Sequence, residues 1–386
     1  MASKPLYLQI KDELKEKIES RQLLPGQQLP TEFELARQHD VSRITSKKAL
    51  EELEKEGYIR RRRGQGSFVA PSVPKTNNSK IISMILPHFR SESWSMAYIK
   101  GAMDFLNARG FFLSIHGSSE LGERNFFSRL IQEGIGGIIF YPDCTNVNIS
   151  QLTAMSMNHF PVVTIDKAVD GLPISSVTSD NFSGGYMATR HLIDYGHRHI
   201  AIVYSSQISE RSSVRDRFVG YCQALTDAGI EIVPEYIVDG YFRAESQTNV
   251  EKSDHEVLRK ILRKLIDANI TGLLVENDYE GMTVYRILKE MGVRIPEDLS
   301  LVGFDNSELL MSSEVHMTTV NQHFHKIGRR AAEMIIEHMD EQVFSVKKIV
   351  LPVDLVPGQT SGAVSVVSSA KSVSPIPALQ KAAKPV

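Results

Sequence analysis

The chain has 386 residues, with 44 Lys and Arg against 46 Asp and Glu and a formal net charge of −2. This length predicts two or three domains rather than one, and the near-neutral charge excludes a protein that is basic over its whole surface. Two cysteines, Cys144 and Cys222, give no disulfide framework, and the polar start and lack of a roughly 20-residue apolar run lead us to expect no signal peptide, no membrane contact and a cytoplasmic protein.

The first segment predicts a helix followed by a helix-turn-helix. Apolar residues recur at helical spacing and predict one buried stripe: Leu6, Ile10, Leu14 and Ile18. Thr31 followed by Glu34 is a capping box, so a helix begins there. Ser42 is the expected N-cap of the next helix, and Gly57 is typical of the residue that ends one.

A basic hairpin is expected next, because the run Arg60–Arg63 is followed by Gly64, Gln65 and Gly66. Residues 1–70 hold 14 Lys and Arg against 11 Asp and Glu, whereas the remainder holds 30 against 35. Alone, the arginine run is as typical of a solvated face or a localisation signal. Joined to the helix pair, it indicates a surface for duplex DNA.

A recognition helix enters the major groove with its N-terminal residues toward the base edges. Arg43 can pair bidentately with guanine, which discriminates by about 1–3 kcal/mol, whereas the other basic residues suit phosphates. We expect the small hairpin tip to approach the minor groove. The candidate DNA-binding residues are Thr31, Arg37, Ser42, Arg43, Ile44, Thr45, Lys47, Lys48, Arg61, Arg63, Gln65 and Gly66.

Four motifs then share one order: Leu29-Pro30-Thr31-Glu32, Val41-Ser42-Arg43-Ile44-Thr45, Glu56-Gly57-Tyr58-Ile59 and Gly64-Gln65-Gly66-Ser67-Phe68-Val69. With them, Pro5 to Ala70 resembles the winged helix-turn-helix of GntR-type bacterial repressors. The chain departs from that pattern at three positions. Phe33 stands where many relatives carry a base-contacting arginine, Ser46 replaces an aliphatic residue and Lys47 replaces an arginine. The resemblance implies the binding mode but not the operator sequence.

Residues 71–79 are polar, contain prolines and lack periodicity, which indicates a linker. Short aliphatic runs then alternate with amphipathic stretches, which predicts parallel sheets covered by helices on both faces. The expected strands are Ile81–Leu86, Phe112–His116, Ile135–Tyr141, Val162–Asp166, Ile200–Ser205, Gly272–Glu276 and Ser300–Phe304. The expected helices are Tyr98–Arg109, Gly184–Tyr195, Phe218–Ala228, Val257–Ala268, Gly281–Met291 and Lys326–His338. Seven strands over this length favour two similar lobes.

Further motifs occur in this part: Ser179-Asp180-Asn181-Phe182-Ser183-Gly184-Gly185, Gly196-His197-Arg198-His199-Ile200-Ala201, Glu276-Asn277-Asp278, Val302-Gly303-Phe304-Asp305 and Thr318-Thr319-Val320-Asn321-Gln322. They make the segment from about Ser79 to Pro357 resemble the effector module of LacI/GalR-type regulators. The resemblance implies a two-lobed, periplasmic-binding-protein-like (type I) α/β domain whose lobes are joined by three crossovers and close on a small polar ligand. The expected organisation is a winged helix-turn-helix at 1–70, a linker at 71–79, an effector and dimerisation domain at 80–358 and a disordered Ser- and Ala-rich tail at 359–386.

Ligands of such sheets bind at the carboxyl ends of the strands. Arg217, Asn277 and Asp305 lie at strand-to-helix corners, where Arg217 would donate to vicinal hydroxyls and Asp305 would accept from others. The same three residues fit the effector contacts that the resemblance implies. The resemblance also adds further positions. The candidate effector-binding residues are then Arg90, Tyr98, Asp166, Arg217, Asn277, Asp305 and Gln322. Candidate neighbours, mostly aromatic platforms for a sugar ring, are Phe89, Trp94, Tyr241 and Phe242.

Structural alternatives stay open for several of these residues. Asp305 and Asn277 could cap the helices that follow them, Gln322 could pair with crossover backbone, and Arg217 could form a surface ion pair. Six histidines lack a carboxylate or cysteine at a recognised metal-ligand spacing: His191, His197, His199, His316, His323 and His325. Because neither a phosphate loop nor a nucleophile motif is recognised either, we expect no metal, no cofactor and no enzyme.

Together the two resemblances imply a sugar-responsive transcriptional repressor of carbohydrate-utilisation genes. Chains that combine both parts resemble the bacterial arabinose repressors, which implies L-arabinose or a related sugar as the effector. We expect a homodimer on a palindromic operator in double-stranded DNA, released when the sugar binds. The alternatives are an activator, a corepressor-dependent regulator of a purine-like ligand, a sugar-acting enzyme, or a transport-type binding module.

Overall fold

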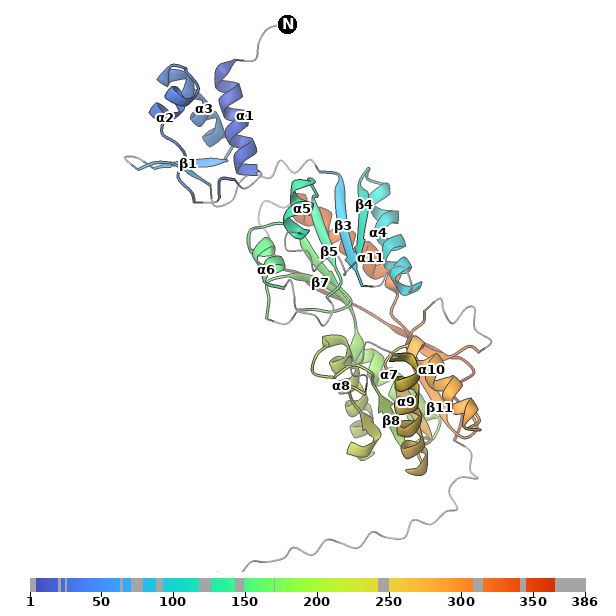
Figure 1. Ribbon diagram of the computed structural model, residues 1–386. Helices are drawn as coiled ribbons and strands as arrows, with labels where there is room; N and C mark the ends of the chain where they lie inside the picture. Colours follow the sequence, from blue (N-terminus) through green and yellow to red (C-terminus); the bar gives the residue numbers. More distant parts are fainter. Residues whose placement is uncertain are drawn as a thin grey trace, which may run out of the picture.

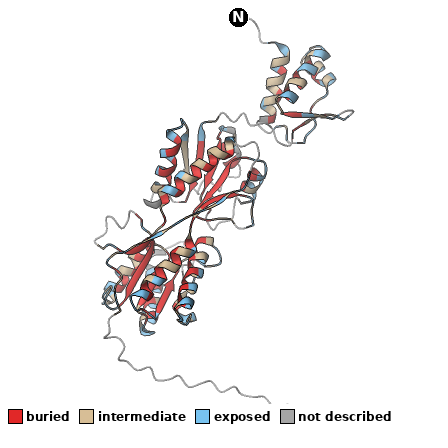
Figure 2. Cartoon of the chain, turned by 180° about the vertical axis from the view of Figure 1, so that it is seen from behind, coloured by how far each residue is buried: buried red, intermediate tan, exposed pale blue. Residues whose placement is uncertain are grey.

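The computed structural model describes residues 5–19, 22–24, 26–62, 65–70, 79–87, 93–117, 126–142, 149–169, 171–241, 250–307, 315–340 and 345–364. Their strands form a two-stranded sheet and two six-stranded sheets (Figure 1). Both large sheets are buried between helices (Figure 2). Within these ranges no helix is long and apolar enough to cross a membrane.

The N-terminal unit consists of α1 (Leu6–Glu19), α2 (Glu32–Gln38), α3 (Arg43–Lys55), β1 (Ile59–Arg62) and β2 (Gly66–Val69). The capping box is present, since Thr31 accepts from the Glu34 amide and Glu34 accepts from the Thr31 amide. Ser42 caps α3 as expected. The predicted stripe of α1 packs into the core from Ile10 onward, but Leu6 is 56% exposed at the first turn of the helix.

The N-terminal lobe holds a fully parallel sheet in the order β13-β7-β6-β5-β3-β4. Its strands are β3 (Ile81–Leu86), β4 (Phe112–Gly117), β5 (Gly137–Phe140), β6 (Val162–Ile165), β7 (Ser175–Ser179) and β13 (Lys348–Leu351). Four helices belong to it: α4 (Ser93–Asn107), α5 (Phe126–Gln132), α6 (Ile149–Met157) and α11 (Phe324–Asp340). Met84 packs with α4 and α11, whereas Ile85 packs with α5 and α6. Alternate residues of β3 therefore enter two separate cores.

The C-terminal lobe repeats this arrangement with the order β14-β12-β11-β10-β8-β9, in which only β14 runs antiparallel to its neighbour. Its strands are β8 (Ile200–Val203), β9 (Ile237–Val238), β10 (Gly272–Val275), β11 (Ser300–Asp305), β12 (Thr318–Asn321) and β14 (Asp354–Val356). Its helices are α7 (Asn181–Asp194), α8 (Ser212–Asp227), the short 3-10 helix Pro234–Tyr236, α9 (Val250–Asp267) and α10 (Asp278–Glu290). Leu273 packs with α9 and α10, and Leu274 packs with α7 and α8.

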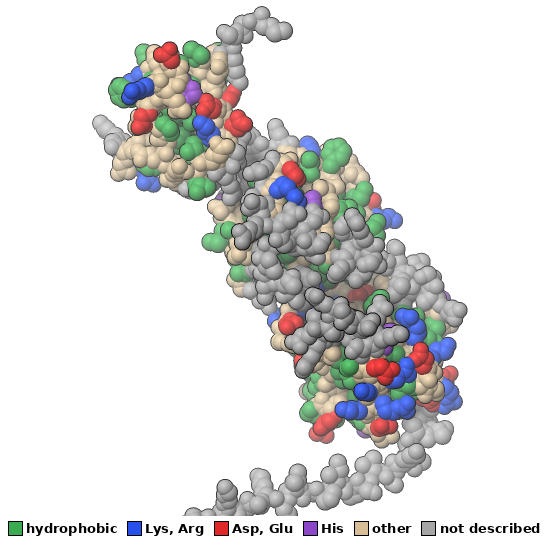
Figure 3. Space-filling model, viewed as in Figure 1, with side chains coloured by type: hydrophobic (Ala, Val, Ile, Leu, Met, Phe, Trp, Pro, Cys, Tyr) green, Lys and Arg blue, Asp and Glu red, His purple; other side chains and the backbone are tan. Residues whose placement is uncertain are grey.

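The chain passes between the lobes three times: from β7 to α7, from β12 to α11, and from β13 to β14. The three expected crossovers are thus present. On the face shown in Figure 3, Lys and Arg side chains of α9 and α10 are mixed with Asp and Glu. This mixture does not form a second basic surface of the kind that nucleic acid requires.

Glycines set the closest helix contacts in both lobes. A Cβ built on Gly328 of α11 would lie 2.1 Å from the carbonyl oxygen of Tyr98 on α4. A Cβ built on Gly185 of α7 would lie 2.1 Å from the carbonyl oxygen of Arg217 on α8. Only glycine allows this approach of two backbones. Each lobe therefore holds one candidate effector residue against a glycine of a neighbouring helix.

β7 and β12 were not predicted from the sequence because they lack an aliphatic run. β7 and β12 are rich in Ser and Thr, yet both are mostly buried. Their hydroxyls have partners in the protein: Thr318 pairs with Ser361 at 2.7 Å, and Thr319 donates to Asp278 at 2.6 Å. Buried hydroxyl groups are tolerated when they are paired in this way.

The expectation of disorder from residue 359 onward is wrong at its start. Thr360 is 1% exposed and its hydroxyl donates to the carbonyl of Leu301 at 2.7 Å. The Gly362 carbonyl accepts from Ser300, and it lies 3.0 Å from Nε2 of His197. These residues extend the C-terminal lobe as far as the described range reaches, and residues 365–386 lie outside it.

Candidate DNA-reading surface and interlobe site

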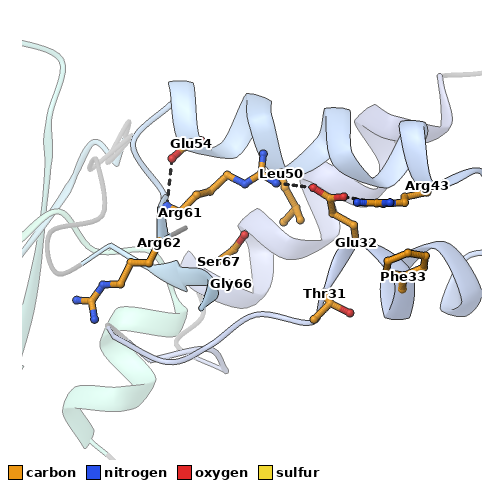
Figure 4. A pocket seen from close by; sticks show the side chains of 10 residues that line it. All are labelled: Thr31, Glu32, Phe33, Arg43, Leu50, Glu54, Arg61, Arg62, Gly66 and Ser67. Atoms are coloured by element: carbon orange, nitrogen blue, oxygen red, sulfur yellow. Dashed lines mark hydrogen bonds and ion pairs between the residues drawn. The ribbon is translucent and has the colours of Figure 1, made fainter. Parts of the chain in front are cut away.

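The DNA-reading candidates meet around one carboxylate at the start of α2. Glu32 accepts from Arg43 Nε at 3.0 Å and also pairs with Arg61 of β1 (Figure 4). Partial burial raises the pKa of Glu32, but the hydrogen bonds from the two arginines hold it below its usual value. Glu32 thereby connects the recognition helix with the wing.

These residues border a cavity of about 540 Å³ between α2, α3 and the hairpin. The side chains drawn in Figure 4 line it: Thr31, Glu32, Phe33, Arg43, Leu50, Glu54, Arg61, Arg62, Gly66 and Ser67. The Arg43 guanidinium lies 4.4 Å above the Phe33 ring. Phe33, at the position that departs from the GntR pattern, thus contacts the expected reading arginine directly.

Other expected DNA contacts have local structural partners as well. Ser42 and Thr45 share a hydroxyl contact of 2.8 Å at the start of α3. Lys47 lies 3.6 Å from Glu51, and Lys48 lies over the Tyr7 ring of α1 at 4.0 Å. Arg37, Ile44, Lys47 and Lys48 are exposed, as an interface requires.

At the wing, Gln65 is exposed, and its carbonyl accepts from the Gln28 side chain at 2.9 Å. Gly66 has a φ of +109°, a value that favours glycine. Arg63 and Gly64 lie outside the described residues. Ser46, the second departure, is buried and donates to the Glu32 carbonyl at 2.7 Å, so its hydroxyl ties α3 to α2.

In the effector domain, five of the seven predicted residues form one interacting group, here called the interlobe cluster: Tyr98, Asp166, Arg217, Asp305 and Gln322. Tyr98 donates to Asp166 at 3.0 Å in the N-terminal lobe, and Gln322 donates to Asp305 at 2.5 Å. Burial raises the pKa of Asp305 well above its usual value, Arg217 opposes this, and Asp166 adds to it. The charges of the two lobes therefore act on each other.

Arg217 is buried and oriented by three groups. Nε donates to Asn181 at 2.8 Å, Nη1 donates to the Glu276 carbonyl at 2.6 Å, and the guanidinium lies 3.6 Å over the Phe304 ring. The alternative of a surface ion pair for Arg217 is therefore wrong.

Both cluster aspartates lie at strand ends and have positive φ: +69° at Asp166, directly after β6, and +120° at Asp305, the last residue of β11. Such backbone costs about 1–3 kcal/mol and persists only where the surroundings impose it. It directs both carboxylates away from an extended strand path.

Of the other two predicted effector residues, Asn277 does not join the cluster. Asn277 caps α10 by accepting from the Glu280 amide at 2.9 Å, so the capping alternative holds for it. Arg90 lies outside the described residues, as do Phe89, Phe242 and the side chain of Trp94. Tyr241 donates to Glu280 within the C-terminal lobe.

Four polar residues beside the cluster were not predicted from the sequence. Lys167 lies 3.5 Å from Asp166 and donates to Tyr141 at 2.8 Å. Glu276 accepts from Ser205 and Ser206 and pairs with Arg211 at 3.4 Å. Tyr141 and Glu276 follow strands directly and Lys167 is the second residue after β6, so the strand-end rule applied to every strand would have found them. Arg211 lies ahead of α8 and had no such signal.

The N-terminal unit is therefore a winged helix-turn-helix, and the interlobe cluster places polar side chains of the two lobes together. Residues 6–69 match the family described as bacterial regulatory proteins, gntR family, and residues 189–361 match the periplasmic binding protein-like domain. Together these features define a DNA-binding transcriptional regulator with a periplasmic-binding-protein-like domain.

Curated relatives refine this class. The arabinose metabolism transcriptional repressor of Geobacillus stearothermophilus is 30% identical over 89% of this chain and 93% of its own length. The repressor of the same name from Halalkalibacterium halodurans is 27% identical over 87% of this chain and 90% of its own. The chain belongs to the family of these arabinose metabolism transcriptional repressors.

Solved structures agree on the fold. A transcriptional regulator CelR–cellobiose complex has a TM-score of 0.63 at 21% identity, covering 86% of this chain and all of that one. A LacI family transcriptional regulator from Enterococcus faecium with bound ribose has a TM-score of 0.60 at 23% identity, covering 74% of this chain and all of that one. At these identities the likeness establishes the two-lobed architecture.

Proposed function

We propose that the chain is a cytoplasmic, sugar-responsive repressor of carbohydrate-utilisation genes, whose effector is L-arabinose or a closely related sugar. The observation that carries the proposal is the interlobe cluster, within a family of arabinose metabolism repressors. It offers carboxylates and an amide at strand ends, together with the guanidinium of Arg217 from α8 and the phenol of Tyr98 from α4. Hydroxyl groups on adjacent carbons are the ligands that such a set recognises.

Two buried oxygens support a polar ligand. Gln322 Oε1 and Ser95 Oγ are buried and have no hydrogen-bond partner among the described residues. Leaving a buried polar atom unpaired costs about 1–3 kcal/mol. Gln322 donates through its amide to Asp305, and Ser95 lies three residues before Tyr98 on the same face of α4. A hydroxylated ligand would supply the missing partners.

For the DNA side, we propose that two chains pair and place two winged helices on a palindromic operator. Sugar binding draws the lobes together, and the Ser212 hydroxyl of α8 already donates to the Ala168 carbonyl of the opposite lobe at 3.4 Å. The altered dimer then releases DNA. No step of this cycle calls for catalysis, so the proposal includes no enzymatic activity.

A gel-shift titration on the DNA upstream of the chain's own gene tests the proposal. L-arabinose, D-xylose, D-ribose, D-galactose and the purine hypoxanthine are added separately. We expect a specific shift that L-arabinose or one related sugar releases. Release by hypoxanthine, or a shift that strengthens with the ligand, would replace the sugar-induced repressor with one of the other regulators. Absence of any specific shift would contradict DNA-dependent repression itself.

A further inference from the structure

The guanidinium of Arg43 is held in one pose at the start of the recognition helix. Its Nε donates to Glu32 Oε2 at 3.0 Å, and its Cζ lies over the Phe33 ring, 4.4 Å from the ring centroid. Among the described residues, the terminal nitrogens Nη1 and Nη2 make no hydrogen bond. Two parallel donors of this kind match O6 and N7 of guanine.

Glu32 is itself a fixed anchor. Its side chain is only 14% exposed, it holds Arg61 of the wing as well as Arg43, and its backbone carbonyl accepts from the buried Ser46 hydroxyl. A donor pair that is oriented before binding loses little conformational entropy when it meets its target. The structure therefore presents Arg43 already aligned.

Exposed apolar side chains adjoin this arginine in sequence or in space. Ile44, the next residue of α3, is 80% exposed, and Phe33 is 65% exposed. Single exposed apolar residues are common on proteins, but these two adjoin one base-reading candidate. Ile44 is β-branched and has few rotamers. The apolar group that a major groove offers is the C5-methyl of thymine.

We propose that Glu32, Phe33 and Ile44 set the sequence that this protein reads: a guanine bound by the aligned Arg43, with an adjacent thymine whose methyl group packs against Ile44. The proposal rests on the proposed DNA-binding function and assigns its base preference. Phe33 stands where many relatives carry a base-contacting arginine, and here it acts by supporting Arg43.

The test begins with the full chain and a pool of random-sequence duplexes, from which bound DNA is selected and sequenced. The preferred duplex is then resynthesised with base analogues that each lack one functional group. Replacing thymine by deoxyuracil removes only the methyl group, and replacing guanine by 7-deazaguanine removes only the N7 acceptor. Each thymine within two base pairs of the guanine is exchanged in turn, and dissociation constants are measured for the wild type and for Ile44→Ala.

The expected result is a guanine-thymine step in the selected motif. One deoxyuracil exchange weakens wild-type binding about fourfold, which is the factor expected for burying one methyl group. The same exchange leaves the DNA affinity of Ile44→Ala unchanged. The 7-deazaguanine exchange weakens wild-type binding about tenfold, and this loss shrinks in Glu32→Gln. Ile44 is exposed, so its replacement leaves the folded unit intact.

Two variants serve as controls. Leu24→Ala removes a comparably exposed aliphatic side chain, and Glu52→Gln removes a carboxylate of α3 that pairs with Lys55 rather than with Arg43. Both variants should lose as much DNA affinity as the wild type when the thymine methyl group or the guanine N7 is removed. The inference is overturned if removing any thymine methyl group leaves wild-type binding unchanged. It is also overturned if Ile44→Ala loses as much affinity as the wild type when the methyl group is removed. Either outcome leaves DNA binding itself unaffected. Failure to retain any duplex overturns the proposed function as well.

Discussion

Single residues of the interlobe cluster combine a functional group with an unfavourable environment. Asp305 has a positive φ, lies beside Arg217 and has a pKa raised by burial. Carboxylates in such places cost stability unless a partner compensates them. Replacing Asp305 should therefore change effector binding and stability in different directions.

Asp305→Asn should weaken effector binding without lowering stability. Asparagine tolerates positive φ and removes a carboxyl group whose charged form burial disfavours, but it loses the acceptor that an ionised carboxylate offers to the effector, worth about 1.5–3 kcal/mol. We expect effector affinity to fall about 10- to 100-fold in calorimetric titration, with an unchanged or higher unfolding temperature. A parallel fall in unfolding temperature would instead identify Asp305 as a structural residue. Asp354→Asn, which removes a carboxylate paired with His323, is the control.

Glu280 predicts how stability depends on pH. Burial first, and then the charge of Glu276, raises the pKa of Glu280 from 4.5 to about 8. Between these values the folded state keeps a proton that the unfolded state has released, so the free energy of unfolding falls as pH rises. We expect a loss on the order of 2 kcal/mol from pH 6 to pH 8, measured by denaturant unfolding.

Glu280→Gln should remove most of this slope. Asp278, whose pKa burial raises to about 7, has the same sign and leaves a smaller slope in the variant. A wild-type stability that rises with pH over this interval would show that these carboxyls are ionised in the folded protein.

At the scale of helices, glycine contacts position the sensor. Gly185 and Gly328 lie against the carbonyls of Arg217 and Tyr98. An added methyl group must separate α7 from α8, or α11 from α4. Helix position and side-chain placement are therefore linked in both lobes.

Gly185→Ala should cost about 1–3 kcal/mol of stability and also weaken effector binding, because it displaces Arg217. Gly281→Ala is the matched control: its Cβ would meet the flexible Met317 thioether rather than backbone. Unfolding and titration of both variants check this. Equal effects of the two would show that the helix contact does not position the arginine.

At the scale of the whole molecule, the sensor and the reader must exchange free energy. The linker residues 71–78 lie outside the described ranges, but thermodynamic linkage holds whatever path the coupling follows. A coupling of about 1–3 kcal/mol corresponds to a 5- to 150-fold change in affinity. If the effector weakens DNA binding by a given factor, bound DNA must weaken effector binding by the same factor.

We therefore expect the selected operator duplex to weaken effector binding by the same factor by which effector weakens operator binding. Titration calorimetry with and without duplex, at one salt concentration, measures both. A scrambled duplex at a concentration that leaves it unbound is the control. An effector affinity indifferent to bound operator would contradict allosteric repression.

The sequence by itself determined the features that depend on local chemistry. The capping box at Thr31 and Glu34, the N-cap at Ser42 and the buried aliphatic strands follow from short-range hydrogen bonding and periodicity. Ordered motifs also indicated the two-part architecture. Strands built from Ser and Thr, such as β7, escaped because their burial depends on partners distant in the chain.

Only the tertiary structure decided how the candidate residues are used. Asn277 and Asp305 both lie at the carboxyl ends of strands, yet Asn277 caps α10 while Asp305 joins Arg217 and Gln322. Glu32 likewise became the anchor of Arg43 and Arg61 only when α2, α3 and the wing packed together. The physical reason is that a side chain's partners are fixed by contacts between elements far apart in sequence, and one-dimensional spacing does not contain those contacts.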